Sequence, residues 1–202
     1  MDALSRPALQ LAERIRSGKE QPSAALRAHI ASDTASPDIV RVCLVEAYDK
    51  RYAVFHDRAS PRKIIGKLPD DDGLGRLALT WLWTDDNRWA GLMNSKNQLR
   101  TALCYYLCAE GLEHYIRSRL ETAWLPQQDV QISPKEQHVW RGRLFGNLVS
   151  AKLGLTMPNG SLEPALETFI WAYGRKSSSK AAPQALERMS LIPAVGTLMN
   201  AV

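Results

Sequence analysis

The segments LRTALCYYLCA at 99–109 and LEPALETFIWA at 162–172 decide the fold class of this chain. In both, a leucine is followed by an alanine, a leucine, an aromatic residue and an alanine at offsets of 3, 4, 7 and 10 residues. On an α-helix these offsets form one stripe, where small alanines let a second helix approach and the ring fills the remaining gap. The repeated stripe therefore predicts helices packed on helices. Its members are Leu99, Ala102, Leu103, Tyr106 and Ala109, then Leu162, Ala165, Leu166, Phe169 and Ala172.

The composition is that of an ordinary folded domain. The 202 residues are 45% hydrophobic and 23% charged, far from the composition of disordered chains. A chain of this length buries roughly 70% of its unfolded surface without a disulfide or a metal. We predict an all-α fold in which residues 1–202 form a single helical domain of antiparallel hairpins, stacked as an irregular bundle or a short α-solenoid.

Serine caps, prolines and glycines divide the chain into predicted helices. An N-terminal helical hairpin within 1–36 contains helices at 5–15 and 23–30, and 175–182 is predicted to be a flexible loop because three serines lie between its charges. The other predicted helices cover 38–56, 60–68, 74–93 with a turn at 84–87, 97–124 with a bend near Gly111, 134–153 ended by Gly154 and a turn at 157–160, 163–174 ended by Gly174, and 183–199.

The segment 38–56 is ambiguous. Val42, Val45 and Tyr48 fall at helical intervals, yet the segment is rich in β-branched residues, and 49–51 could form a hairpin turn. No other part of the sequence offers strands to join, and an isolated hairpin is marginal in water. We therefore predict a helix.

Two glycines one helical turn apart interrupt the predicted helix at 134–153. Gly142 and Gly146 fall on the same side of that helix. Because neither has a side chain, the pair predicts the close approach of a neighbouring helix.

The last part of the chain contains a small, aromatic, small spacing at Ala165, Phe169 and Ala172. This spacing resembles the second helix of a tetratricopeptide or pentatricopeptide repeat, over about 34 residues in one copy. The pair Leu153-Gly154 lies one residue out of the family's register, and Ser177 occupies the position of its closing proline. The resemblance implies a superhelical array of helix pairs that binds partners.

The charge is mildly basic, with a formal net charge of +5 and 17 arginines against 9 lysines. Guanidinium groups suit planar contacts to phosphate or carboxylate, so the excess permits RNA as a partner without requiring it. We predict that a basic groove on two consecutive helices binds RNA or a protein partner, with one tryptophan stacked on a base. Its candidate residues are Arg117, Arg119, Trp140, Arg141 and Arg143. In the alternative interpretation Trp140 is a core residue and the arginines pair in solvent with Glu113, Glu121 or Glu136.

No arrangement of residues requires a particular reaction. Cys104 and Cys108 lie one helical turn apart, with His114 or Cys43 as possible further ligands, but zinc sites usually contain two such chelating pairs. We predict no metal and no cofactor. The alternative is a helical enzyme whose site is assembled from Cys104, Cys108, Glu110 and His114.

Three cysteines, an odd number in a chain that needs no disulfide, predict reduced thiols and an intracellular location. We predict a cytoplasmic protein, with mitochondrial import as the alternative because arginines surround an apolar stripe in the first thirty residues, although acidic residues interrupt them. The apolar stretch 77–83 is too short to span a membrane.

These observations predict a non-catalytic α-helical interaction module that binds a protein partner or RNA. A third possibility is a structural subunit of a larger complex, because six tryptophans and an apolar C-terminus provide contact area.

Overall fold

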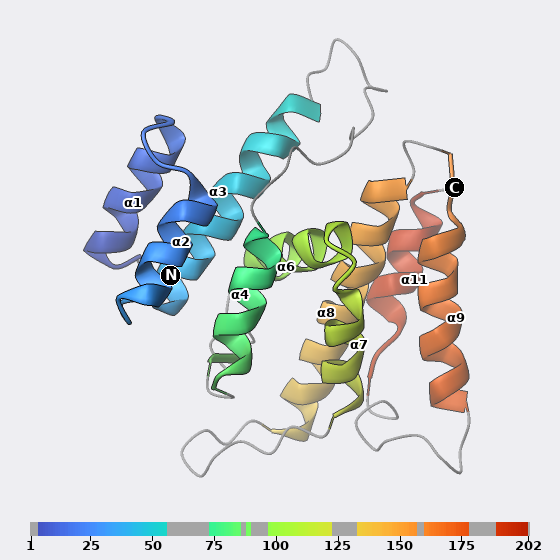
Figure 1. Cartoon of the computed structure of the whole chain (residues 1–202). Coiled ribbons are helices and arrows are strands. Elements are labelled where there is room, and N and C mark those ends of the chain that lie inside the picture. The colour runs from blue at the N-terminus through green and yellow to red at the C-terminus, as the bar shows by residue number, and fades with distance from the viewer. Residues whose placement is uncertain are drawn as a thin grey trace. The chain divides into compact units, whose positions relative to one another are not determined.

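The computed structural model describes residues 4–55, 73–85, 88–89, 97–122, 133–156, 160–177 and 189–201. In these ranges every regular element is a helix and no strand is present, which confirms the all-α prediction (Figure 1). Contacts between residues divide the chain into unit 1, Met1–Tyr106, and unit 2, Leu107–Val202. The prediction of a single domain stays a prediction, and each unit is described by itself.

Unit 1 is organised around one long helix. It contains α1 (Arg6–Arg16), α2 (Pro22–Ala31), α3 (Pro37–Phe55), α4 (Leu74–Trp83) and most of α6 (Asn97–Ala109), and α3 contacts α1, α2 and α4. The helical prediction for 38–56 is confirmed by α3, because its β-branched residues bury their side chains against other helices. The fully buried leucines and isoleucine at the centre of this core are Leu11, Ile15, Leu26, Leu44, Leu74 and Leu103.

Polar contacts attach both ends of α1 to α3. At the start, the Ser5 backbone N–H donates to Asp38 Oδ2 over 2.9 Å. At the end, the guanidinium of Arg16 donates from Nε and Nη2 to the two carboxylate oxygens of Glu46. The N-terminal helix is therefore an integral part of unit 1.

Unit 2 is a group of helices around α8 (Pro134–Thr156), which contacts α7 (Glu113–Glu121), α9 (Glu163–Ser177) and α11 (Ile192–Met199). The helices α8 and α9 run in opposite directions, as Figure 1 shows. Leu144, Phe145, Leu148 and Val149 of α8 are fully buried, and the Phe145 ring centroid lies 6.4 Å from that of Phe169 on α9.

The predicted single helix 97–124 is wrong, because α6 ends at Ala109 and α7 begins at Glu113. Gly111 has a φ of +70°, its N–H donates to the Cys108 carbonyl over 3.2 Å, and Leu112 N–H donates to the Leu107 carbonyl over 2.7 Å. These two bonds form the Schellman motif that ends a helix. The left-handed conformation of Gly111 directs the chain out of the helix, and the two bonds pair carbonyls of the last turn of α6. The chain therefore forms two helices where a single bent helix was expected.

Two other helices end two or three residues later than the glycines predicted to stop them, and α8 ends directly before the predicted turn at 157–160. The helices α8 and α9 continue through Gly154 and Gly174 to Thr156 and Ser177. Neither glycine has a positive φ, so each remains helical. The segment 183–199 is not one helix, because residues 189–191 are non-helical and Pro193 lies in the first turn of α11. The predictions for 56–72, 86–87, 90–93, 123–124, 157–159 and 178–188 lie outside the described residues.

The predicted close approach at Gly142 and Gly146 is confirmed. A Cβ atom on Gly142 would lie 2.8 Å from the carbonyl oxygen of Ser190, and one on Gly146 would lie 2.8 Å from Cβ of Pro193. The start of α11 and the residues before it therefore lie directly on the backbone of α8.

The two sequence stripes face the interior, with one exception. Ala102, Tyr106 and Ala165 are buried, and Phe169 is half-buried against Phe145. Leu166 is exposed, in contrast to the prediction. The buried face of α9 is formed by Ala165, Thr168 and Ala172, and Leu166 lies about 100° around the helix from Ala165.

Candidate functional site

The five residues predicted to form a basic groove lie on α7 and α8 of unit 2, and most of them are not exposed. Trp140, Arg119 and Arg141 are buried, Arg117 is half-buried, and Arg143 is exposed. A ring that stacks on a base must be accessible, and the ring of Trp140 is covered. Their role in binding stays a prediction.

Arg141 is 2% exposed and completes the C-terminal end of α7. Its Nη1 donates to the Leu120 carbonyl over 2.8 Å, and its Nη2 donates to the Thr122 carbonyl over 3.0 Å. The last carbonyls of a helix have no partner within the helix and carry partial negative charge, so a guanidinium suits this position. Burial, with the positive charge of Arg119, lowers the Arg141 pKa to about 10, and the side chain remains protonated at neutral pH.

Arg117 connects α7 to α9. Its Nη2 donates to Thr168 Oγ1 over 3.1 Å, and its Cζ lies 5.2 Å from the centroid of the Trp171 ring, within the range of a cation–π interaction. The hydroxyl of Thr168, a fully buried residue, donates in turn to the Pro164 carbonyl over 2.8 Å. This arginine therefore holds helices together inside unit 2.

The acidic residues named in the alternative interpretation have partners other than the groove arginines. Glu113 pairs with Lys152 over 2.5 Å, and Glu121 lies 3.4 Å from Nε of Arg175. Burial acts to raise the pKa of Glu113, but the hydrogen bond from Lys152 and nearby positive charges outweigh it, so this pKa is lowered. These pairs connect α7 with α8 and with α9.

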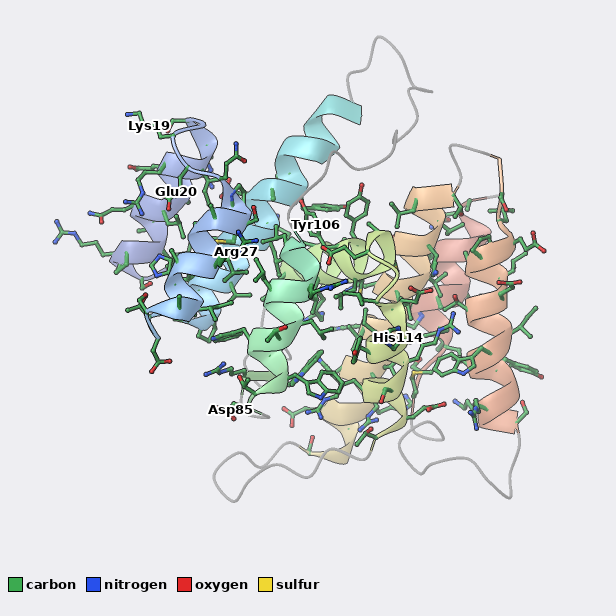
Figure 2. All side chains as sticks on the ribbon, viewed as in Figure 1. Lys19, Glu20, Arg27, Asp85, Tyr106 and His114 are labelled. Atoms are coloured by element: carbon green, nitrogen blue, oxygen red, sulfur yellow. The ribbon has the colours of Figure 1, made fainter. Side chains whose placement is uncertain are left out.

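The residues of the catalytic alternative differ in exposure. Cys104 is buried, while Cys108 and Glu110 are half-buried. His114, labelled in Figure 2, lies exposed in the first turn of α7, with its ring beside that of Tyr115. Burial raises the pKa of Cys108 to about 12, and a thiol with that pKa is a poor nucleophile at neutral pH. In the ranges that the structure describes, no three His, Cys, Asp or Glu side chains are grouped to hold a metal ion.

One accessible feature of the described part of unit 2 is an apolar stripe on the outer side of α9. Leu166, Ile170 and Tyr173 are 42–64% exposed and occupy positions i, i+4 and i+7. These positions lie on one side of a helix, away from the small residues that pack in the interior. We call this set the α9 stripe. Glu163 and Glu167 beside it are also exposed.

A second exposed apolar set lies on α11, which contacts α8 and α9. Ile192, Val195 and Met199 are 38–80% exposed, and Gly196 between them is exposed as well. We call these four residues the α11 face. The amino-acid sequence shows an apolar C-terminal region but does not distinguish either exposed set, because the same helical periodicity describes a face that is covered and one that is not.

No protein-family model matches this chain, and no match is found among curated proteins or solved structures. The resemblance to tetratricopeptide or pentatricopeptide repeats stays a prediction. Among the described residues, no helix has both the length and the apolar character that crossing a bilayer requires.

Proposed function

We propose that this chain is a non-catalytic α-helical interaction module that binds a protein partner through the α9 stripe. The observation that carries the proposal is that α9 has a buried side of small residues and, in addition, an exposed side of large apolar residues. Ala165, Thr168 and Ala172 face the interior of unit 2, while Leu166, Ile170 and Tyr173 are exposed.

The large side chains on the outer side of α9 would gain free energy if a partner covered them. Covering a Leu, Ile or aromatic side chain contributes about 1.5–3 kcal/mol when it is removed completely from water. Three such residues at i, i+4 and i+7 form the pattern by which one amphipathic helix packs against another. Clustered exposure of this kind is typical of interaction surfaces.

The charges beside the stripe indicate the chemistry of the partner. Glu163 and Glu167 are exposed on the N-terminal half of α9. Opposite charges across an interface favour correct partners and faster association. The proposed partner segment is therefore an amphipathic helix with an apolar stripe and Lys or Arg beside it.

The RNA alternative has weaker support. Of its five candidate residues Arg143 alone is exposed, whereas Arg141 and Arg117 are engaged inside unit 2. Contacts to several phosphates would make affinity fall steeply with salt. Binding of unstructured RNA at low salt that is lost in Arg143→Glu would favour this alternative over the proposal.

The test uses a photo-crosslinking amino acid placed at Ile170 of the full chain in its native cell. The matched control carries the same group at Ser150, an exposed residue of α8. We expect a discrete protein adduct at position 170 and little adduct at position 150. The double variant Glu163→Lys with Glu167→Lys should reduce the yield of the adduct at 170 several-fold. Mass spectrometry should identify the crosslinked partner peptide, and its sequence should have the pattern of a basic amphipathic helix.

Absence of an adduct at 170 would contradict the proposal, and so would equal adducts at both positions. An adduct that the charge reversals leave unchanged would contradict the stated partner chemistry.

A further inference from the structure

We propose that the α11 face, formed by Ile192, Val195, Gly196 and Met199, is a self-association surface on which a second copy of this chain packs about a two-fold axis. This inference goes beyond the proposed function, because it concerns a different helix and a different partner. It is carried by the exposure, the lack of charge and the glycine of this face.

The exposed side of α11 has no polar side chain. With 100° between successive residues, the four members of the α11 face lie within an arc of about 100°. Ala194 is buried on the other side, and Thr197 is half-buried. Its hydroxyl donates to the Pro193 carbonyl over 2.9 Å. The one polar side chain within this helix is therefore directed to its own backbone.

The lack of charge makes a second copy the favoured occupant. In a two-fold interface the same patch lies on both subunits, so each residue of the patch meets the patch itself. A charged patch would repel its own copy. The segment 189–201 contains no Asp, Glu, Lys or Arg, and so this face carries no charge of its own that opposes such a contact.

Gly196 gives a second, geometric reason. Glycine weakens a helix interior relative to alanine, and at Gly142 and Gly146 the fold explains the choice because an added Cβ would collide with the segment 190–194. At Gly196 an added Cβ would meet nothing within 4 Å, as at the helical Gly154 and Gly174, so no neighbouring atom obstructs the approach of a second helix to this part of the α11 backbone. A second helix that crosses at Gly196 could approach the backbone closely, with Ile192 and Met199 packed on either side of the crossing.

The size of the face sets the expected strength of the dimer. Its exposed side chains present on the order of 400 Å² per copy, about half of the roughly 800 Å² per partner of a standard interface. We therefore expect a reversible dimer that forms at micromolar concentrations or above, and that coexists with monomer.

The test is sedimentation equilibrium of the full chain over roughly 1 to 300 µM, a range that brackets half-saturation of a weak interface. We expect a monomer–dimer equilibrium. Met199→Lys should raise the dissociation constant at least tenfold, because a two-fold contact places two new charges in one interface. Ile192→Lys is an independent variant at a mostly exposed position, which separates loss of association from loss of folding.

Two controls make the result specific. Ile170→Lys on α9 should leave the dimer unchanged, since it alters only the surface of the proposed function. Gly196→Ala should raise the Tm of the dilute monomer yet weaken the dimer about fivefold or more. Gly174→Ala, also a helical glycine whose added Cβ meets nothing within 4 Å, should raise the Tm without affecting association.

A chain that remains monomeric throughout would overturn this inference and leave the α9 proposal standing. A dimer that survives both lysine variants would also overturn it. Loss of the crosslink at position 170 with an intact dimer would instead contradict the proposed function alone.

Discussion

Arg141 and Arg143 lie two residues apart on α8, and they differ in exposure and in hydrogen bonding. The guanidinium of Arg141 is buried and donates to the Leu120 and Thr122 carbonyls, whereas Arg143 is exposed. A helix turns 200° over two residues, so neighbouring members of one motif point in opposite directions. At this scale the predicted groove separates into a structural arginine and a surface arginine.

We expect Arg141→Met to lower the free energy of unfolding by about 2 kcal/mol or more, because hydrogen bonds from a charged donor are lost and two carbonyls lose their partner. Arg143→Met should change it by less than about 0.5 kcal/mol, as is usual for exposed sites. Urea denaturation of both variants beside the wild type measures the difference. Equal stability of the two variants would show that the carbonyl contacts contribute nothing.

At the scale of elements, the glycines of α8 have two different roles. Gly142 and Gly146 lie under the segment 190–194 and permit it to approach the helix backbone, while Gly154 has open space around it. Glycine is therefore required for close packing at positions 142 and 146, whereas position 154 has room for a side chain. Gly111 has yet another role, since its positive φ separates α6 from α7.

We expect Gly142→Ala and Gly146→Ala each to destabilise the protein by about 1–3 kcal/mol, since a methyl group would lie 2.8 Å from Ser190 or Pro193. Gly154→Ala in the same helix should be neutral or stabilising by up to about 1 kcal/mol. Thermal denaturation of the three variants provides the comparison. Stabilisation in all three would mean that α11 does not lie as close to α8 as described.

At the scale of the whole molecule, the reactivity of the three thiols measures how often the folded structure opens. Cys43 and Cys104 are fully buried, and burial raises the pKa of both Cys43 and Cys108 to about 12. Thiol reagents attack the thiolate. Each cysteine should therefore react through opening of the structure around it.

We expect the native protein at pH 8 to react with a disulfide reagent at least about 100-fold more slowly than the protein in denaturant, for all three thiols. Stopped-flow absorbance in both conditions measures the ratio. A thiol that reacts in the native protein as fast as free cysteine would support the catalytic alternative, because it would identify an accessible thiolate.

Three features could be read from the amino-acid sequence alone: the helical fold class, the helical state of 38–55, and the close approach at Gly142 and Gly146. These features depend on periodicity and on the absence of a side chain, which are local properties that can be read along one segment. The interior positions of Ala102, Tyr106 and Ala165 follow from the same periodicity.

The side of each helix that is covered follows from how the helices pack together, and it could not be read along one segment. The carbonyls that accept hydrogen bonds from Arg141 belong to residues 21 and 19 positions earlier in the chain. No local pattern in α8 predicts these contacts. Leu166 is exposed while Thr168 is buried, because α8 lies against the small residues of α9. Exposure depends on which distant segment packs on a helix, and for that reason the α9 stripe and the α11 face emerged only from the folded chain.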